Sequence, residues 1–218
     1  MTSKILVNRL RPLLSKIVSP VQSAFIPGRS IHENILLTHE IMHKFRKIKG
    51  QQAWVALKLD MKKAYDRLEW PFIKRCLEQL GFHPKWIQWI MKCITSVSYS
   101  LLVNDEPSGF ILPTRRIRQG HLLSPYIFIL RMEALSNVLF NESLQPKTGI
   151  ELKLSTETEW ISCLLFADDC LLFCKANTTA CTKLKSVLGT FCNTLANLLI
   201  TINQRSPFRQ MLLQSINR

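Results

Sequence analysis

Two adjacent aspartates, Asp168 and Asp169, lie inside the apolar run CLLFADDCLLFCK at residues 163–175. Carboxylates this close together repel each other unless a cation or a shared proton lies between them. The flanking segments 164–166 and 171–173 predict two short buried strands, joined by a two-residue turn that the aspartates form. A turn does not require two acids, because Asn-Gly or Asp-Gly would supply the positive φ at lower cost. A plain hairpin turn and a metal site therefore both remain open.

A third carboxylate ends another predicted strand, WVALKLD at residues 54–60. The odd-numbered residues of this segment fall on one apolar face, and the even-numbered ones, including Lys58 and Asp60, fall on the other. Taken alone, this pattern fits an edge strand with one hydrated face. Together with the hairpin, it predicts that rigid carboxylates from separate elements converge, which is the ligand set that Mg²⁺ prefers.

Polynucleotide synthesis is the chemistry that such a carboxylate set suits best. A primer 3′-hydroxyl attacks the α-phosphate of a nucleotide in line, and charge builds on the attacking and leaving oxygens. Two Mg²⁺ ions about 3.5 to 4 Å apart stabilise both oxygens. We therefore expect Asp60, Asp168 and Asp169 to lie within reach of one metal pair.

Composition points to a polyanionic partner. The chain has 218 residues, enough for one substantial core, with a net charge of +14 and a pI near 9.8. Residues 1–50 hold nine Lys or Arg against two Glu, so they carry seven of the fourteen net charges. This segment is either a phosphate-contacting surface or a solvated basic face. A membrane is the weaker expectation, because no apolar stretch reaches the roughly 18 to 20 residues that span a bilayer.

Cysteine usage and the amino terminus add two further expectations. Seven Cys without a secretory signal indicate reduced thiols in an intracellular protein, in the nucleus or cytoplasm. The spacing of the cluster at residues 163–181 does not match a zinc ribbon or finger, so these Cys are expected to be small core residues. The basic, acid-free start of the chain also fits a mitochondrial presequence.

Periodicity predicts an α+β protein in which antiparallel hairpins pack against helices on one face of a two-layer domain. The expected helices are 5–17, Ile31–Lys47, Pro71–Leu80, Pro84–Thr95, a helix capped by Ser124 that runs to Phe140, and Thr178–Asn197. The expected strands are 54–60, 98–103, 110–112, 150–154, 161–174 and 199–203.

Several segments resemble one known family in the same order along the chain. FADD at 166–169 resembles the aromatic-Ala-Asp-Asp box of reverse transcriptases, and KLDMKKAYD at 58–66 resembles their first aspartate box. The stretches QSAFIPGRSIHENILL, RQGHLLSPYIFIL and ISCLLFADDCLLF are similar to the LINE-class (non-LTR) retrotransposon enzymes of plants. The amino-terminal SKILVNRLRPLL resembles the basic fingers helix of that family, which replaces the presequence interpretation.

The resemblance implies a right-hand polymerase palm, an antiparallel sheet backed by helices, with partial fingers and no thumb. Residues 1–218 would be a single partial reverse transcriptase domain, with about 1–50 fingers-like and about 51–218 mainly palm. The implied activity is RNA-directed DNA polymerisation on an RNA template, from a DNA primer and dNTPs. The missing thumb and endonuclease would be encoded elsewhere or lost.

The resemblance also implies roles for individual residues. The catalytic and metal-binding residues would be Asp60, Asp168 and Asp169, which would hold two Mg²⁺ ions or, in their place, Mn²⁺. The nucleotide-binding residues would be Tyr65, Gln119, Gly120, Arg29 and Lys58. Tyr65 would lie under the sugar and exclude a 2′-hydroxyl, and Arg29 would reach the triphosphate. Lys58 would either neutralise phosphate or pair with an acid.

The chain departs from the family pattern at four positions, one of which is Arg205, where lysine is usual. His121 and Leu122 stand where an acid and a proline are usual, so the loop loses a charge and a rigid turn. Leu199 stands where glycine is usual, and leucine does not adopt positive φ cheaply. These departures leave an alternative function, a catalytically inactive retroelement remnant that at most binds nucleic acid through its basic surface.

Overall fold

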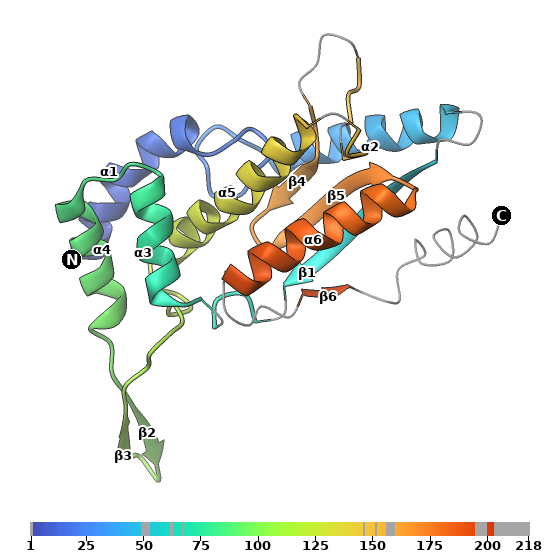
Figure 1. The fold of residues 1–218 in the computed structure, drawn as a ribbon. Coiled ribbons are helices and arrows are strands. Elements are labelled where there is room, and N and C mark those ends of the chain that lie inside the picture. The colour runs from blue at the N-terminus through green and yellow to red at the C-terminus, as the bar shows by residue number, and fades with distance from the viewer. Residues whose placement is uncertain are drawn as a thin grey trace.

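A four-stranded antiparallel sheet with helices on both faces forms the body of the computed structural model, and a two-stranded hairpin projects from it (Figure 1). The structure describes residues 2–48, 53–61, 63–66, 68–145, 147–150, 152–155, 160–194 and 200–202. Leu199 and Arg205, two of the departures from the family pattern, therefore lie outside the described residues.

Helices account for more of the described chain than strands do. They are α1 (Thr2–Ile17), α2 (Ile31–Lys47), α3 (Trp70–Gln79), α4 (Pro84–Thr95), α5 (Ser124–Ser143) and α6 (Thr178–Thr194). Proline occupies the first turn of α3, α4 and α5, where its missing N–H removes no helical hydrogen bond. Gly81 follows α3 at φ +78°, the left-handed conformation that ends many helices.

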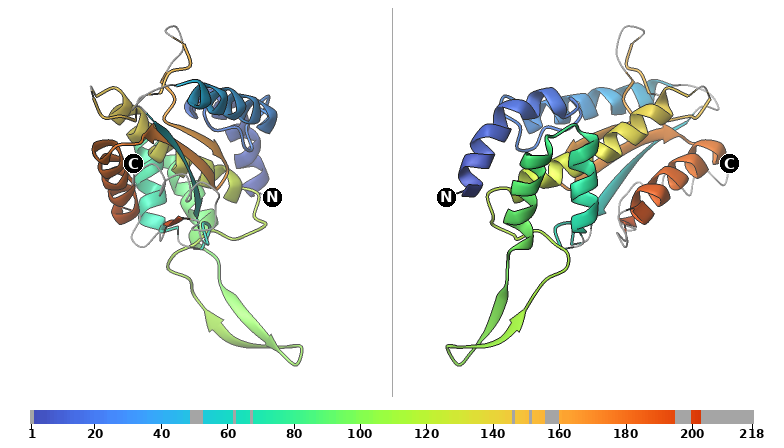
Figure 2. Two further views of the ribbon diagram at one scale, coloured as in Figure 1. Left: turned by 90° about the vertical axis from the view of Figure 1, so that its right-hand side faces the viewer. Right: turned by 60° about the vertical axis from the view of Figure 1, so that its left-hand side comes forward.

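The strands are β1 (Trp54–Met61), β2 (Tyr99–Val103), β3 (Glu106–Ile111), β4 (Cys163–Phe166), β5 (Asp169–Lys175) and β6 (Ile200–Ile202). The order in the main sheet is β4-β5-β1-β6, and each neighbouring pair is antiparallel. Strands β2 and β3 form a separate hairpin that extends away from the sheet and its helices (Figure 2). The predicted α+β class is confirmed.

The predicted face alternation of β1 is also confirmed. The odd-numbered residues of β1, from Val55 to Leu59, pack in the large core with α1, α3, α5 and α6. On the other face, Ala56 packs with Phe173 of β5 and Ile41 of α2 in a second, smaller core. The prediction that helices cover one face only was wrong. The second face is apolar around Ala56 and Phe173, and α2 covers it there.

Helix α1 is amphipathic as predicted, but its apolar face is narrower. Leu6, Leu10 and Leu14 recur at four-residue spacing and are almost fully buried. Ile5 and Leu13, which were expected on the same face, are 48% and 45% exposed. Val7 is buried as well, so the buried stripe runs along Leu6, Leu10 and Leu14 and widens towards Val7, away from Ile5 and Leu13.

Other element boundaries differ from the predictions. Residues 150 and 152–154 form no strand, and the expected strand 161–174 is interrupted by the β4–β5 turn. Leu123, not Ser124, caps α5, because Ser124 already lies in the helix and its hydroxyl donates to the carbonyl of Arg118 at 2.6 Å. Strand β3 begins at Glu106 instead of residue 110.

No helix in the described part of the chain combines the length and apolar character needed to cross a membrane.

Candidate active site

The turn between β4 and β5 carries the two adjacent aspartates, one residue out of the predicted register. Phe166 pairs with Asp169, so the two turn residues are Ala167 and Asp168. The prediction that Asp168 and Asp169 form the turn was wrong, because Asp169 is already the first residue of β5. Ala167 adopts φ +54°, a left-handed conformation that is costly for alanine.

Strand pairing brings the third aspartate to the same place. Leu59 of β1 pairs with Cys170 of β5. The same antiparallel register, continued by one residue, puts Asp60 opposite Asp169. Directly opposed residues have Cα atoms about 4.5 to 5.5 Å apart and side chains on the same face. Asp60 and Asp169 are both exposed, and Asp168 is partly exposed. The register therefore brings Asp60 and Asp169 to the same end of the sheet, and the convergence of all three carboxylates stays a prediction.

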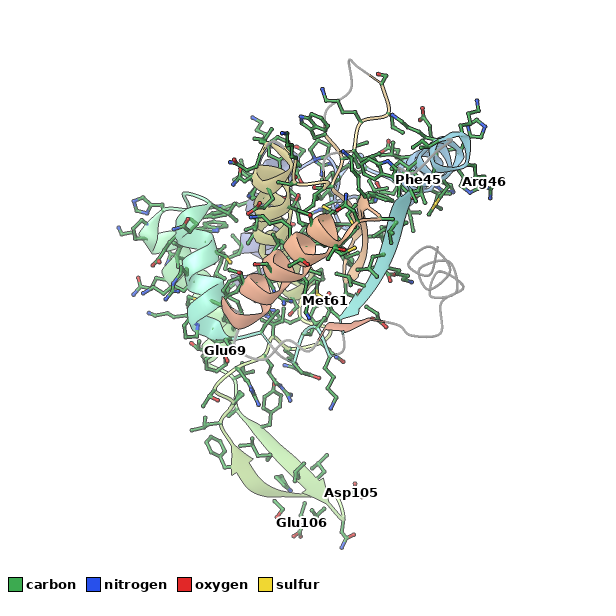
Figure 3. All side chains as sticks on the ribbon, turned by 45° about the vertical axis from the view of Figure 1, so that its right-hand side comes forward. Phe45, Arg46, Met61, Glu69, Asp105 and Glu106 are labelled. Carbon is green, nitrogen blue, oxygen red and sulfur yellow. The ribbon has the colours of Figure 1, made fainter. Side chains whose placement is uncertain are left out.

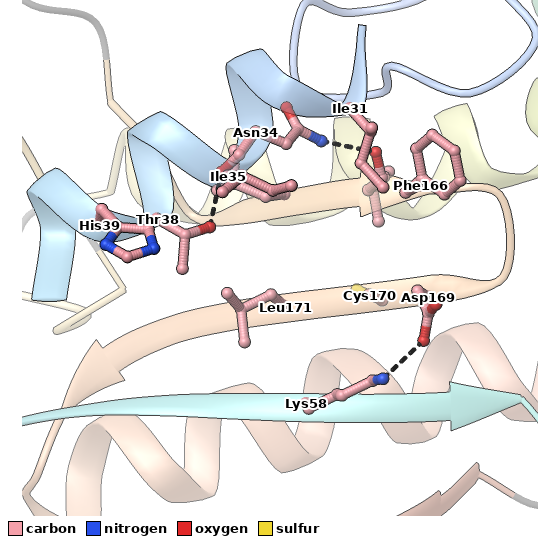
Figure 4. A pocket seen from close by; sticks show the side chains of 12 residues that line it. Ile31, Asn34, Ile35, Thr38, His39, Lys58, Phe166, Asp169, Cys170 and Leu171 are labelled. Atoms are coloured by element: carbon pink, nitrogen blue, oxygen red, sulfur yellow. Dashed lines mark hydrogen bonds and ion pairs between the residues drawn. The ribbon is translucent and has the colours of Figure 1, made fainter.

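Lys58 supplies a positive charge within this acidic group. Its Nζ lies 3.0 Å from Oδ1 of Asp169, across the β1–β5 pair (Figure 4). The pKa of Lys58 is raised above its ordinary value, first by the hydrogen bond and charge of Asp169 and then by the charges of Asp60 and Asp168. One ammonium group is thus attracted by all three predicted metal ligands.

The donor chemistry of the site suits a hard cation. Carboxylate oxygens are the ligands that Mg²⁺ and Mn²⁺ prefer, and the cation that the three aspartates attract here is the Lys58 ammonium. Within the described ranges, no three His, Cys, Asp or Glu side chains stand close enough together to hold a metal ion. A divalent ion at this site would require the aspartates to draw together and Lys58 to give up its ion pair.

A hollow of about 350 Å³ opens beside Asp169. It lies between α2 and the second face of the sheet, and both Lys58 and Asp169 line it (Figure 4). Its α2 wall includes Asn34, whose side-chain amide donates to the carbonyl of Leu165 at 2.9 Å. Asp169 thus borders a concave surface that is open to solvent.

Tyr65 lies near the carboxylates and is partly inserted in the core. Its ring stacks on Phe128, with ring centroids 4.9 Å apart and an interplanar angle of 22°. Burial raises the pKa of the Tyr65 hydroxyl, and the charge of Asp168 raises it further. The phenol is therefore held rigidly on one side and is close enough to Asp168 to sense its charge.

The loop that precedes α5 keeps a defined turn despite its departures from the family pattern. Gln119 and Gly120 are exposed, and Gly120 takes φ +79°. His121 contacts α1, with Nε2 2.9 Å from the hydroxyl of Ser3, and its main-chain N–H donates to the carbonyl of Arg118. These contacts of His121 fix the loop next to Leu122, where the family usually has a proline.

Arg29 has a structural role in this structure. Its two terminal nitrogens donate to the carbonyls of Val18, Ser19 and Gln22 at 2.6 to 2.8 Å. Burial lowers the pKa of its guanidinium, although the charges of Glu133 and Glu33 oppose this. The guanidinium thereby holds the segment that follows α1, and its contact with a triphosphate stays a prediction.

Gln22 contacts the β4–β5 turn and was not among the predicted site residues. Its side chain is fully buried and accepts a hydrogen bond from the N–H of Ala167 at 3.1 Å. Local periodicity gives no signal for such a contact, because the two residues are 145 positions apart. The only sequence signal was the place of Gln22 at the start of QSAFIPGRS, one of the segments that resemble the family.

Comparisons with known proteins identify the family directly. Residues 1–205 match the family described as reverse transcriptase (RNA-dependent DNA polymerase). The chain is 27% identical over 170 residues to the transposon TX1 uncharacterized 149 kDa protein of Xenopus laevis. It is 31% identical over 138 residues to the retrovirus-related Pol polyprotein from type-1 retrotransposable element R2 of Popillia japonica.

The shared region is a small part of these relatives. It covers 78% of this chain but 12% of the Xenopus protein, and 63% of this chain but 21% of the Popillia polyprotein. Both relatives are named as products of transposable elements, as the sequence resemblance implied.

Solved structures support the fold. Telomerase from Candida tropicalis in complex with a fragment of telomeric RNA aligns with a TM-score of 0.60 over 88% of this chain and 31% of its own, at 14% identity. The apo enzyme truncated from its C-terminal domain aligns with a TM-score of 0.58 over 86% of this chain and 36% of its own, at 16% identity. The predicted right-hand polymerase fold is confirmed. With residues 1–205 matched to one family and its two aspartate boxes meeting on adjacent strands, the chain belongs to the reverse transcriptases.

Proposed function

We propose that this chain is the polymerising part of an RNA-directed DNA polymerase of a non-LTR retrotransposon. It would extend a DNA primer along an RNA template by adding dNTPs to the primer 3′-hydroxyl. The observation that supports the proposal is the register of β1 and β5 in a chain of this family, because the paired Leu59 and Cys170 immediately adjoin Asp60 and Asp169. The chain spans only a small part of its curated relatives, so this activity is inferred for it.

Asp60, Asp168 and Asp169 would hold two Mg²⁺ ions, or Mn²⁺ in their place. When bound, these ions would supply the positive charge that activates the primer hydroxyl and stabilises the leaving pyrophosphate. Lys58 would leave Asp169 as the carboxylates turn to the metal, and its ammonium would then be free to neutralise a phosphate of the nucleotide. This combines the two roles that the sequence left open for Lys58.

The remaining predicted residues would shape the nucleotide pocket. Tyr65 is suited to exclude a 2′-hydroxyl, because its stack on Phe128 prevents the ring from moving away. The exposed loop at Gln119 and Gly120 would line the opposite side of the pocket. Arg29 would reach the triphosphate only if it released the carbonyls that it now binds.

The basic amino-terminal helix would contact the nucleic-acid backbone. Its basic side chains, Lys4, Arg9, Arg11 and Lys16, are all exposed, whereas the leucines on its other face are buried. Affinity that comes from such phosphate contacts falls steeply as salt rises. We therefore expect template binding and extension to be strongest at low ionic strength.

Primer extension on an RNA template at low salt tests the proposal. The purified chain should extend a DNA primer in the presence of Mg²⁺, and the double variant Asp168→Ala/Asp169→Ala should not. The matched control is Asp105→Ala/Glu106→Ala, which removes two adjacent acids from the tip of the other hairpin, far from the sheet (Figure 3). Both double variants change the net charge equally. A loss of primer extension in Asp168→Ala/Asp169→Ala alone would therefore show that the position of the removed acids matters, and not the total charge.

Two results would contradict the proposal. Equal extension by the parent and by Asp168→Ala/Asp169→Ala would show that these aspartates are not the catalytic carboxylates. Absence of extension by a parent chain that is folded by circular dichroism would favour the alternative function, an inactive retroelement remnant. Retained, salt-sensitive RNA binding by that inactive chain would identify it as a nucleic-acid-binding module.

A further inference from the structure

Gln22 holds the turn that carries Asp168. Its side chain is fully buried, and its Oε1 accepts two main-chain hydrogen bonds, from Ala24 at 3.0 Å and from Ala167 at 3.1 Å. The second bond joins the segment after α1 to the first residue of the β4–β5 turn. A buried side chain with two main-chain partners has little freedom to reorient, so it fixes the position of the Ala167 N–H.

The segment around Gln22 is itself fixed against β4. The N–H of Leu165 donates to the carbonyl of Val21 at 2.8 Å, and the N–H of Ser23 donates to the carbonyl of Leu165 at 3.1 Å. Gln22 and Leu165 therefore form a parallel bridge at the edge of the sheet. These bonds set the distance from which the Gln22 side chain reaches Ala167.

Ala167 needs such an external partner. It takes φ +54°, which alanine adopts only at a cost, and its methyl group cannot form the local hydrogen bonds by which Asn and Asp tolerate this conformation. A hydrogen bond to its N–H from a rigid buried acceptor favours this one conformation over the others that a turn could take. Because Ala167 is held in this conformation, the direction of the backbone at Asp168 is fixed as well.

We propose that Gln22 is a positioning residue for the reverse transcriptase reaction. It acts through Ala167, without contact to substrate or metal, and it sets the conformation of the turn so that Asp168 and Asp169 face the site that they share with Asp60. This inference rests on the proposed function, because it assumes that these aspartates bind the metal. Its structural part, the control of the turn by Gln22, stands on the hydrogen bonds alone.

The chemistry of the site favours glutamine over its nearest substitutes. Leucine has a similar size but no acceptor, so it would leave the buried N–H of Ala167 without a partner. Glutamate keeps the acceptor but brings a carboxylate into a buried position. The Nε2 of Gln22 is buried and has no hydrogen-bond partner in the described part of the chain, which is a cost that the acceptor role of Oε1 offsets.

The test compares Gln22→Leu with the parent chain in two measurements that do not depend on catalysis. The first is amide hydrogen exchange, resolved by NMR, at Ala167 and Asp168 relative to the amides of α5. The second is the affinity for Mn²⁺ by titration calorimetry. Loss of one buried hydrogen bond corresponds to a change of up to about tenfold. We expect exchange at the turn to rise and Mn²⁺ affinity to fall by about this factor, with α5 unchanged.

Two further variants make the effect specific. Adding Ala167→Gly to Gln22→Leu should recover part of the lost Mn²⁺ affinity, because glycine takes positive φ without external support. Ser23→Ala is the matched control. Its hydroxyl is buried beside Gln22 without a hydrogen-bond partner among the described residues, so its removal should change neither measurement. If Gln22→Leu does not fold, Gln22→Asn replaces it, since its shorter side chain cannot reach Ala167.

Two results would overturn the inference. Unchanged exchange and Mn²⁺ affinity in the folded Gln22 variant would show that the turn does not depend on this residue. Exchange that rises equally at the turn and throughout α5 would show a general loss of stability instead of positioning. Failure of the proposed function gives a different pattern, in which the parent and Asp168→Ala/Asp169→Ala show the same Mn²⁺ affinity, and the exchange data alone then decide the role of Gln22.

Discussion

Two hairpins of this protein are closed by turns of the same length, but these turns are stabilised in different ways. Each is closed by a two-residue turn, Asn104–Asp105 between β2 and β3 and Ala167–Asp168 between β4 and β5. The first turn lies at the exposed end of a hairpin that projects from the body. The second lies at the edge of the main sheet and is hydrogen-bonded to the buried Gln22.

The turn sequences explain the difference. Asn104 and Asp105 take φ +52° and +63°, and Asn and Asp are among the residues that tolerate such values. That turn forms from its own residues and needs no support. Ala167 takes a similar φ with a side chain that does not favour it, so the surrounding structure must impose the conformation. Backbone strain of this kind concentrates at functional sites, and here it immediately precedes the paired aspartates.

Removing one charge from each turn should separate the hairpins most clearly. Asp168→Asn and Asp105→Asn replace the second residue of each turn with its neutral isostere. Loss of a metal ligand removes several kcal/mol of transition-state stabilisation, so we expect Asp168→Asn to lower primer extension by about 10²- to 10⁴-fold. Asp105→Asn should leave the rate within about twofold, since this exposed group contributes under about 0.5 kcal/mol.

Steady-state extension rates at saturating Mg²⁺ provide the measurement, and equal melting temperatures show that both variants are folded. If Asp168→Asn kept more than a tenth of the parent rate, the Asp168 charge would have no catalytic role. The β4–β5 turn would then differ from the β2–β3 turn only in its hydrogen bond to Gln22.

The hairpins also show how far the sequence predicts this structure. The strands of the main sheet and the faces of β1 could be predicted, because alternating burial leaves a two-residue period in the apolar side chains. Strand β3 was predicted too short, since its first residues, EPSG, are poor strand formers that no core selects. An exposed hairpin is stabilised by hydrogen bonds between its own two strands. These bonds leave no pattern of apolar residues in the sequence.

The turn at the candidate site could not be placed correctly from local sequence. In LLFADDCLLF, the apolar residues on either side fit a turn at Ala167–Asp168 as well as one at Asp168–Asp169. In the structure the turn is at Ala167–Asp168, where the N–H of Ala167 donates to Oε1 of Gln22, a residue that is distant in the chain. The chemistry of the site was predictable because carboxylates are visible as residue types. The support of the site was not, because a glutamine in a loop has no distinctive pattern.

Relieving the strain in one turn should change stability modestly. A left-handed alanine costs about 1 to 2 kcal/mol, and glycine loses about 0.5 to 1 kcal/mol more backbone entropy on folding. Ala167→Gly should therefore raise the free energy of unfolding by about 0.5 to 1 kcal/mol. Asn104→Gly should change it by less than about 0.5 kcal/mol, because asparagine already tolerates its conformation.

Urea unfolding followed by circular dichroism measures both changes, provided that the dependence on denaturant is the same in each variant. A loss of stability in Ala167→Gly would mean that the packing of the Ala167 methyl group outweighs the relief of strain, since the residue is only 9% exposed. The two turns would then differ less in strain than their φ values suggest.

A small change in stability is also expected for Lys58, whose ion pair joins β1 to β5, the strand after the Ala167–Asp168 turn. Lys58 and Asp169 side chains are 56% and 58% exposed, and such exposed pairs contribute less than about 1 kcal/mol. Lys74 and Glu78 on α3 form a matched control, with a similarly exposed pair at 3.8 Å. Lys58→Met and Lys74→Met should each lower the free energy of unfolding by less than about 1 kcal/mol.

The two lysine variants should nevertheless differ in metal affinity. Lys58→Met removes the cation that the three aspartates attract, so Mn²⁺ no longer competes with an ammonium group, and its affinity by titration calorimetry should rise by about three- to tenfold. Lys74→Met should leave that affinity unchanged. Weaker Mn²⁺ binding by Lys58→Met would mean that Lys58 holds the carboxylates together instead of occupying the place of a metal. The β4–β5 turn would then depend on β1 as well as on Gln22 for its orientation.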